Sequence, residues 1–182
     1  MPPRVKITEE QILDAVFTLT RTKGFEVVNA RSIAKELGCS THPIFRIFKN
    51  MGELKVEFML YVEKYYTDFI TSNVIEGDSF LSIGLAYVDF ASKERNLFKM
   101  LFMSENFETN DFMSLIENEE NQPIVSAIQE MVGVNEQKAK EIFINTWLYT
   151  HGIASMVATN NLSLTESRVE ELLRSTFAAF TK

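Results

Sequence analysis

Cysteine, proline and glycine are scarce in this 182-residue chain, and each shortage excludes a class of protein. One cysteine rules out an internal disulfide and fits a reducing compartment. Four prolines and seven glycines are too few for the many turns of an all-β fold. No apolar run reaches the roughly 18 residues of a membrane-spanning helix, and the N-terminus lacks the apolar core of a signal peptide. We therefore expect a soluble, cytoplasmic protein without a membrane partner.

Catalytic and metal-binding patterns are also missing. The only two histidines, His42 and His151, are far apart and have no carboxylate at metal-ligand spacing. No cysteine pair, GxSxG elbow, phosphate-binding loop or glycine-rich nucleotide loop occurs. The acidic cluster of Glu117, Glu119 and Glu120 is better explained as a solvated helix face than as an acid–base pair. We expect no enzyme activity, no cofactor and no metal.

What the chain has in abundance is helical periodicity, within a composition that is 46% hydrophobic and includes fifteen Phe and eight Met. Thr8 and Gln11 form a capping box at the start of the first helix. Apolar residues then recur every three or four positions, which predicts an all-α fold. Gly84 indicates either a close helix crossing or room for a ligand, and Pro123 should interrupt or kink its helix. The predicted helical segments are 9–23, 30–37, 41–48, 53–72, 80–94, 95–107, 111–132, 136–160 and 165–182.

The segment from Asn29 to Lys49 predicts two short helices joined by a tight turn. Asn29 is a suitable N-cap for the first, and Gly38 stops it at a position where a left-handed backbone conformation costs glycine little. Ser40 is a candidate N-cap for the second. Pro43 is tolerated there because the amide of a first-turn residue has no intrahelical partner. Helix, glycine-containing turn, helix is the helix-turn-helix arrangement, whose second helix enters the DNA major groove.

The flanking residues make this pattern more specific. An N-cap, Ile-Ala, Gly-x-Ser, an aromatic residue, Phe and Leu follow one another at fixed offsets, and the first 54 residues resemble the TetR family of transcriptional regulators. Trp147 followed by His151 and Gly152 is similar to the C-terminal class of that family named for its Trp-His-Gly motif. The residues that carry the N-terminal resemblance are Asn29, Ile33, Ala34, Gly38, Cys39, Ser40, Phe45, Phe48 and Leu54.

The resemblance implies two functional parts. Residues 1–51, the headpiece, would be a three-helix DNA-binding domain, and residues 52–182, the body, a larger helical domain for ligand binding and dimerisation. The charge distribution supports this division. Residues 1–50 carry eight Lys and Arg against five Asp and Glu, whereas residues 51–182 carry ten against twenty. Their net charges of +3 and −10 place the only basic surplus beside the helix-turn-helix. Residues 1–7 are a basic arm that either reaches the DNA or is disordered.

Position within the helix-turn-helix gives the candidate DNA contacts. Ser40, Thr41 and His42 offer polar groups to bases or phosphates at the start of the second helix, and Arg46 lies one turn further on. Pro43 and Phe45 would supply apolar contact, for instance to a thymine methyl group, although Phe45 is equally well placed for the headpiece core. Arg31 and Lys49 are expected phosphate partners.

Three positions depart from the family pattern. The family usually has Tyr in place of Phe45, often His in place of Ile47, and Lys in place of Met51. Three polar or charged contacts to DNA are thereby replaced by apolar side chains. The departures leave the fold prediction unchanged and motivate an alternative function, a dimeric helical ligand-binding or protein-interaction module with weakened DNA binding.

The body is rich in aromatic residues and methionine, which indicates either a packed core or a cavity for a small apolar or aromatic effector. Two interpretations are also open for His151, which is either a hydrogen-bonded core residue or a ligand contact. The last two helices are apolar on more than one face, which predicts a homodimer through them. We expect a repressor-type regulator that binds palindromic double-stranded DNA, with an affinity controlled by the effector. The candidate lining residues are Tyr87, Phe98, Phe102, Phe107, Phe112, Trp147, His151 and Met156.

Overall fold

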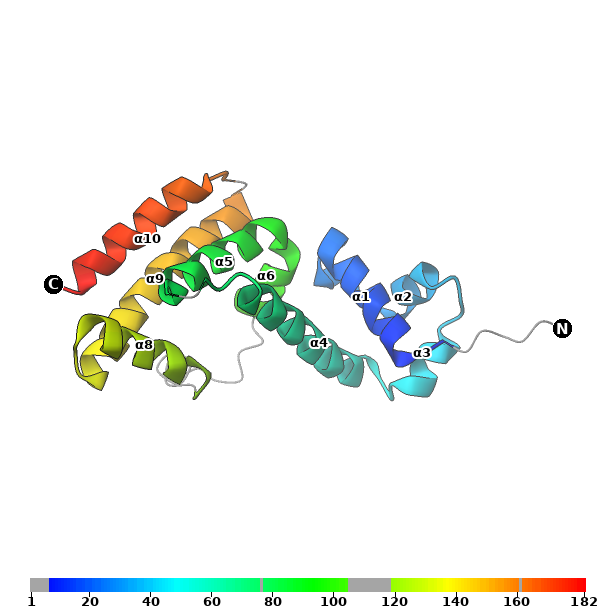
Figure 1. The fold of residues 1–182 in the computed structure, drawn as a ribbon. Helices are drawn as coiled ribbons and strands as arrows, with labels where there is room; N and C mark the ends of the chain where they lie inside the picture. The colour runs from blue at the N-terminus through cyan, green and yellow to red at the C-terminus, as the bar shows by residue number, and fades with distance from the viewer. Residues whose placement is uncertain (1–6, 76, 105–118, 161) are drawn as a thin grey trace. The chain divides into compact units, whose positions relative to one another are not determined.

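In the computed structural model, residues 7–75, 77–104, 119–160 and 162–182 are described, and every regular element in these ranges is helical (Figure 1). The prediction of an all-α fold is confirmed. Two 3-10 turns, η1 (Phe25–Val27) and η2 (Glu119–Asn121), accompany the α-helices. The α-helices are α1 (Glu9–Lys23), α2 (Ala30–Glu36), α3 (His42–Ile47), α4 (Met51–Thr71), α5 (Ser79–Lys93), α6 (Arg95–Phe102), α8 (Gln122–Val132), α9 (Glu136–Asn160) and α10 (Glu166–Phe180).

The chain divides into two compact units that interleave in sequence. The first unit comprises Met1–Thr67 and Glu94–Ser104, and the second comprises Asp68–Lys93 and Glu105–Lys182. Helix α6 therefore belongs to the same unit as α1, α2 and α3, although α5 separates them along the chain. The functional boundary expected between residues 51 and 52 stays a prediction.

The first unit is organised on α1. The capping box predicted at its start is present, because the Thr8 hydroxyl accepts from the Gln11 amide and the Gln11 side chain accepts from the Thr8 amide. The buried face includes Ile12, Val16 and Leu19, as the apolar spacing predicts. On a neighbouring face, Phe17 makes edge-on ring contacts with two tyrosines of α4, at centroid distances of 5.8 and 4.9 Å. Aromatic packing thus joins α4 to the helix that supports the helix-turn-helix.

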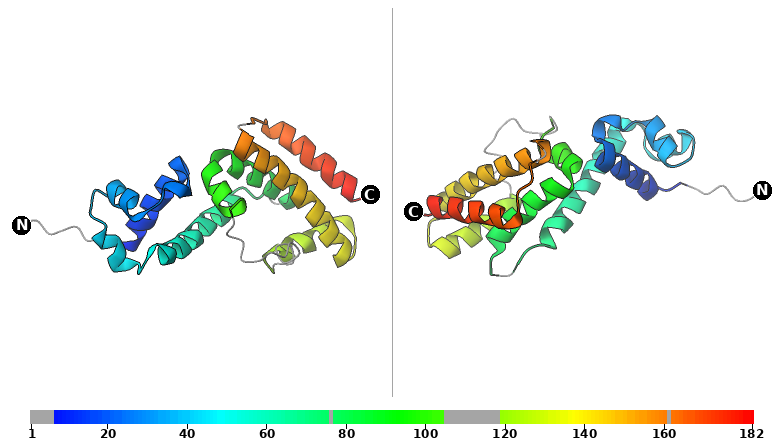
Figure 2. Two further views of the ribbon diagram at one scale, coloured as in Figure 1. Left: turned by 180° about the vertical axis from the view of Figure 1, so that it is seen from behind. Right: turned by 90° about the horizontal axis from the view of Figure 1, so that it is seen from above.

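The second unit is a bundle in which α5 and α10 both pack against α9, as both views of Figure 2 show. Gly84 lies where α5 meets α10. A Cβ atom at this position would come within 3.0 Å of Leu173 Cδ1 and 4.0 Å of Thr150 Cγ2. Of the two explanations that the sequence left open for Gly84, the structure shows the close helix crossing.

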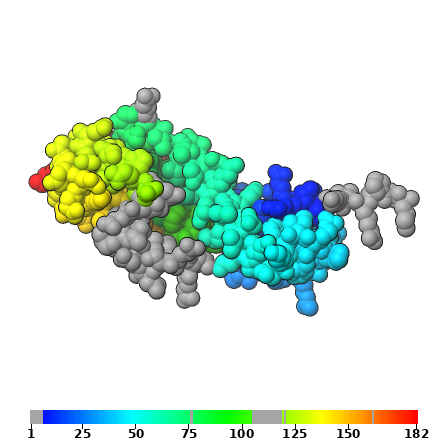
Figure 3. All heavy atoms as spheres, turned by 90° about the horizontal axis from the view of Figure 1, so that it is seen from below, coloured from blue at the N-terminus to red at the C-terminus, as the bar shows by residue number. Residues whose placement is uncertain are grey.

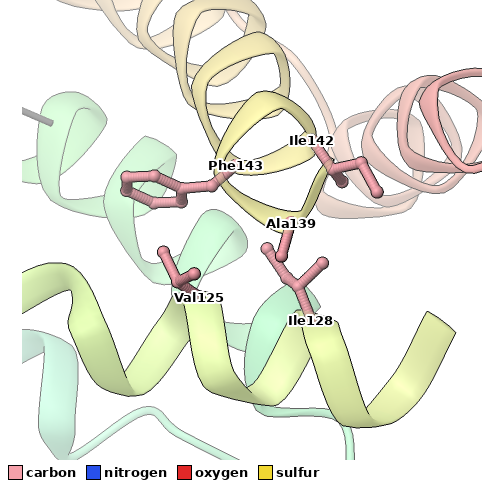
Figure 4. Packing of buried hydrophobic residues seen from close by; sticks show 5 residues of the cluster. All are labelled: Val125, Ile128, Ala139, Ile142 and Phe143. Atoms are coloured by element: carbon pink, nitrogen blue, oxygen red, sulfur yellow. The ribbon is translucent and has the colours of Figure 1, made fainter. Parts of the chain in front are cut away.

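Helix α8 packs across one end of α9. Its Ile128 points toward Ala139 of α9, and its Val125 points toward Phe143 of the same helix (Figure 4). Pro123 lies in the first turn of α8, where its missing amide breaks no helical hydrogen bond. The α-helix begins at Gln122, one residue before Pro123, so this proline does not kink α8, and residues 111–118 of the predicted helix lie outside the described residues.

Candidate nucleic-acid interface

Helix α2 begins at a reciprocal cap. Asn29 Oδ1 accepts from the amides of Arg31 and Ser32 at 3.1 and 3.0 Å, and the Ser32 hydroxyl accepts from the Asn29 amide at 2.9 Å. The same hydroxyl donates to the Val27 carbonyl at 2.9 Å, which ties the cap to the preceding turn. Asn29 therefore has the N-cap role that the sequence indicated. The cap fixes the start of α2 and places Arg31 in its exposed first turn.

The turn after α2 is a Schellman motif. Gly38 has a φ of +64°, in the left-handed region. The Cys39 amide donates to the Ala34 carbonyl at 2.9 Å, and the Gly38 amide donates to the Lys35 carbonyl at 3.2 Å. This is the six-to-one and five-to-two pair of bonds that defines the motif. The turn sets the direction in which the chain enters α3.

Two buried residues fix the rotation of α3 about its own axis. Ile44 is completely buried and Phe48, immediately after the helix, is 3% exposed. The helix begins one residue later than predicted, and its N-cap is Thr41, without a side-chain capping bond, rather than Ser40. With Ile44 and Phe48 turned inward, the opposite face of this short helix is left outside. In Figure 3 the cyan atoms of α3 and of the start of α4 form part of the outer surface of the first unit.

The exposed face of α3 carries most of the predicted DNA contacts. Phe45 is 46% exposed, so it does not belong to the core of the headpiece. Of the two interpretations left open for this residue, burial in that core is excluded. Pro43 and Thr41 are half-buried. The exposed residues of the predicted set are Arg31, Ser40, His42, Phe45, Arg46 and Lys49.

Arg46 has a partner within the protein. Its Nη2 atom donates to the carbonyl oxygen of Ile7 at 3.1 Å. Ile7 directly precedes Thr8, the N-cap of α1, so this bond connects the end of α3 to the entry of α1. Nothing in the sequence indicated it, because the two residues are 39 positions apart. A contact between Arg46 and DNA stays a prediction. The guanidinium has further N–H donors that could make such a contact.

The positions that depart from the family pattern differ in exposure. Phe45 is exposed, whereas Ile47 and Met51 are half-buried. Met51 is the first residue of α4, which begins two positions earlier than the predicted segment 53–72. Asn50 Oδ1 accepts from the Glu53 amide at 3.0 Å, and Glu53 accepts from the Lys49 amide at 2.5 Å. The spacing of Asn50 and Glu53 is that of a capping box, a signal that places this helix start correctly.

A buried carboxylate joins three helices of the first unit. Glu94, which precedes α6, is 3% exposed and accepts two hydrogen bonds from Arg21 of α1, at 2.7 and 2.6 Å. The Tyr65 hydroxyl of α4 donates to the same carboxylate at 3.0 Å. Asn96 Nδ2 donates to the Arg21 carbonyl at 3.0 Å. We call Arg21, Tyr65 and Glu94 the carboxylate clamp.

Electrostatics follow from this clamp. The hydrogen bond to Glu94 raises the pKa of Arg21, and burial together with that carboxylate raises the pKa of Tyr65. A comparable bond to Asp14 raises the pKa of Tyr61 to about 12. The phenols of α4 therefore stay protonated as donors at neutral pH, and they hold α4 to carboxylates of other elements in the first unit. The sequence analysis missed the clamp, since no local pattern pairs two charges 73 residues apart.

The predicted effector residues fall into three groups. Tyr87, Trp147, His151 and Met156 lie in the second unit, Phe98 and Phe102 lie in the first, and Phe107 and Phe112 fall outside the described residues. Phe98 is fully buried and contacts Phe102 at a centroid distance of 5.1 Å, and Phe102 also contacts Tyr66 at 5.1 Å. Met156 is 52% exposed.

His151 is at the centre of the group in the second unit. Its Nδ1 lies 2.9 Å from the Tyr87 hydroxyl and its Nε2 lies 3.2 Å from the Ser155 hydroxyl. The Trp147 ring stacks on the imidazole, with centroids 5.2 Å apart and an interplanar angle of 16°. Burial lowers the pKa of His151, so the neutral form is favoured at neutral pH. In that form one ring nitrogen donates and the other accepts.

Within the described ranges, no group of three or more His, Cys, Asp or Glu is placed to hold a metal ion. Nor does any helix in those ranges combine the length and apolarity needed to span a bilayer. Cys39 is a half-buried free thiol in the Schellman turn.

The fold occurs in solved structures of bacterial regulators. A TetR-like transcriptional regulator from Rhodococcus sp. RHA1 is 16% identical over 98% of this chain and 96% of its own, with a TM-score of 0.67. A protein from Vibrio parahaemolyticus assigned to the TetR family of transcriptional regulators is 16% identical over 93% and 96%, with a TM-score of 0.63. A second transcriptional regulator from Rhodococcus sp. Rha1 is 13% identical over 96% of each chain, with a TM-score of 0.60. At these identities the likeness shows the fold.

Sequence comparison gives the family. Among curated proteins none is a significant match. Residues 80–180, more than half of the chain, match the family described as the tetracycline-repressor-like C-terminal domain. This match covers most of the second unit together with α6, and the helix-turn-helix precedes it in the expected place. The chain therefore belongs to the TetR family of transcriptional regulators.

Proposed function

We propose that this protein is a homodimeric repressor that binds a palindromic DNA operator through α3 and releases it when an apolar or aromatic small molecule binds the body. The observation that carries DNA binding is the exposed face of α3. Ile44 and Phe48 hold this helix by its buried side, and His42, Phe45 and Arg46 are left outside beside the exposed Ser40 and Lys49. Helix-turn-helix proteins insert this face into the major groove.

Dimerisation is supported by the outer faces of α9 and α10. On α9, Leu148, Tyr149 and Met156 are 40–52% exposed and share a face with the exposed Gly152. On α10 the exposed residues include the small Ser175, Ala178 and Ala179. Large apolar side chains on one helix and small ones on its neighbour suit the close packing of a four-helix interface. A second copy of the chain would cover these faces through a two-fold axis.

Effector control is supported by the arrangement around His151. Tyr87, Trp147 and His151 combine aromatic surface with hydroxyl and imidazole groups that can reorient toward a ligand. An effector that prefers one spacing of the two headpieces would shift the population and so change operator affinity. Residues 1–51 would read the DNA, and residues 52–182 would bind the effector and the second copy.

A second candidate function rests on the apolar departures. Phe45 offers no hydrogen bond from the exposed face of α3, and Ile47 and Met51 are half-buried. A dimer of this kind with weakened DNA affinity would act as a helical ligand-binding or protein-interaction module. In either case we propose that the protein is not an enzyme. DNA as its target favours the cytoplasm as the place of action.

Selection of bound duplexes from a random DNA pool tests the proposal. We expect a palindromic consensus and a linear fall of log affinity with log salt, with a slope of about −0.9 per released phosphate contact. Arg31→Ala and Lys49→Ala should each make the slope shallower by about one contact per half-site, which is two per dimer, and Lys138→Ala on α9 is the charge-matched control. No enriched duplex from a folded dimer would reject DNA repression in favour of the interaction module.

A further inference from the structure

Phe45 is the one large apolar side chain on the exposed face of α3. Nearly half of its surface is in contact with water, whereas its neighbours in sequence and space, Ile44 and Phe48, are 0% and 3% exposed. Four of the five residues at positions 44–48 are apolar, and of these Ile44 and Phe48 are buried, Ile47 is half-buried and Phe45 is exposed. Exposing a phenyl ring to water is unfavourable, so covering the Phe45 ring with an apolar partner would lower the free energy.

The surroundings of Phe45 place the ring inside the candidate DNA surface rather than at its edge. Residues three and four positions apart share one side of a helix, so Phe45 lies beside Thr41 and His42 of the preceding turn. Lys49 lies beyond the end of α3, after the extended residue Phe48, and is exposed. The ring is therefore flanked on α3 by a hydroxyl and an imidazole group, which are partners of bases and phosphates.

The chemistry of the ring limits what it can read. A phenyl group has no hydrogen-bond donor or acceptor, so it makes no bond to a phosphate or to the polar edge of a base. The C5-methyl group of thymine is the apolar feature that a base pair presents in the major groove. Cytosine carries hydrogen at the same carbon, and 5-methylcytosine carries the methyl group without the other features of thymine.

We propose that Phe45 is a specificity-determining residue that selects a C5-methylated pyrimidine, thymine or 5-methylcytosine, at one position of each half-site. The inference rests on the proposed DNA binding and adds the chemistry that this one side chain recognises. It also makes operator affinity sensitive to cytosine methylation at that position.

The test uses the full-length dimer and the operator obtained by selection. Each thymine is replaced in turn by deoxyuridine, which removes the methyl group and leaves base pairing unchanged. One methyl-sized group is worth about 0.8 kcal/mol and 1.4 kcal/mol is tenfold, so we expect about a fourfold loss of affinity per half-site at one thymine. Cytosine at that position should weaken binding, and 5-methylcytosine should recover part of the loss.

Phe45→Ala identifies the residue responsible. This variant should bind the thymine and deoxyuridine operators with equal affinity at the position where the unchanged protein distinguishes them. Since Phe45 is exposed, the variant should unfold at the same temperature as the unchanged protein. Val56→Ala is the matched control, because Val56 is an apolar residue of α4 with 60% exposure, and this variant should keep the fourfold difference.

Two results would overturn the inference while leaving DNA binding intact. One is an unchanged affinity at every deoxyuridine position. The other is an equal deoxyuridine effect in the unchanged protein and in Phe45→Ala, which would assign methyl recognition to another side chain. If the unchanged protein selects no operator at all, the proposed function fails first, and this inference fails with it.

Discussion

Gly38 shows how one residue decides the geometry of the DNA-reading unit. Its φ of +64° costs glycine little, and the space that a Cβ would occupy is empty within 4 Å. Any effect of a side chain here is therefore conformational rather than steric. We expect Gly38→Ala to lower the free energy of unfolding by about 1 kcal/mol, measured by urea denaturation. Gly38→Asn should cost less, since asparagine tolerates the left-handed region, and equal losses for the two variants would contradict this explanation.

His151 gives a prediction about pH. Burial lowers its pKa in the folded chain, whereas an unfolded histidine titrates near 6.5. As the pH falls below about 6.5, the unfolded chain takes up a proton that the folded chain resists, so this contribution to stability is lost toward acid pH. The difference in free energy of unfolding between the unchanged protein and His151→Gln should therefore shrink from pH 8 to pH 5. Parallel stability curves would show that His151 is not the titrating group.

The sequence was informative about residues with a local role. Asn29, Gly38 and Thr8 act on amides a few positions away, and such roles leave a local pattern. Phe45 could not be placed in advance, because Ile44, Phe45 and Phe48 all suit burial and a six-residue helix is too short to show which side is apolar. The bond from Arg46 to the Ile7 carbonyl joins distant parts of the chain and leaves no local signal.

At the scale of elements, the carboxylate clamp holds α1, α4 and the start of α6 together, and its strength can be measured against a matched pair. Arg21 and Arg174 have similarly exposed side chains, 51% and 55%. Their carboxylate partners differ, because Glu94 is 2% exposed and Asp78 is 43% exposed. When the arginine is removed, only the buried carboxylate is left without a partner that offsets the cost of burying its charge.

We expect Arg21→Ala to lower the free energy of unfolding by about 2 kcal/mol, because a buried charged acceptor loses two bonds. The value is below the 3–5 kcal/mol typical of a fully buried pair, since water reaches the arginine side. Arg174→Ala should cost much less, because exposed ion pairs contribute little to stability. Urea denaturation of the two variants gives the comparison, and equal costs would show that the burial of Glu94 adds nothing.

Helix bounds were predicted well where apolar residues recur over many turns. They were predicted less well where they depend on one residue whose structural role differs with its place in the helix. The bounds predicted for the long helix at 136–160 agree with α9. Pro123 was read as an interruption, although proline at the first helical turn is equally ordinary, and the sequence does not say where a helix begins. The carboxylate clamp could not be predicted, because the packing of helices, rather than the spacing of residues in the sequence, decides which charged residues meet.

For the whole molecule, the homodimer is the assumption on which operator symmetry depends. Because a two-fold interface brings the same patch together twice, a charge placed on it appears on both sides. Leu148→Glu on α9 should therefore weaken self-association by about 3 kcal/mol or more, over a hundredfold, measured by sedimentation equilibrium. Val56→Glu introduces the same charge at an exposed apolar position of α4 and should leave association unchanged. A dimer that survives Leu148→Glu would place the interface elsewhere.

The family was predictable from the sequence because the helix-turn-helix and the Trp-His-Gly spacing are both short and local. Operator and effector preferences were not, since they depend on side chains brought together from several helices. Tyr87 and His151, for example, are 64 positions apart and share a hydrogen bond. Such a pair becomes a candidate site only when the bundle is known.

The interleaving of the two units has a consequence for how the protein is made. A growing chain emerges from the ribosome N-terminus first and tends to fold domain by domain. The first unit is incomplete until Glu94–Ser104 has emerged, because Arg21 and Tyr65 await Glu94. By then all of α5 is outside, while α9, against which it packs, has not been synthesised. The face of α5 that packs on α9, which includes Tyr87, thus lacks its partner helix during translation and offers chaperones a binding segment before the second unit exists.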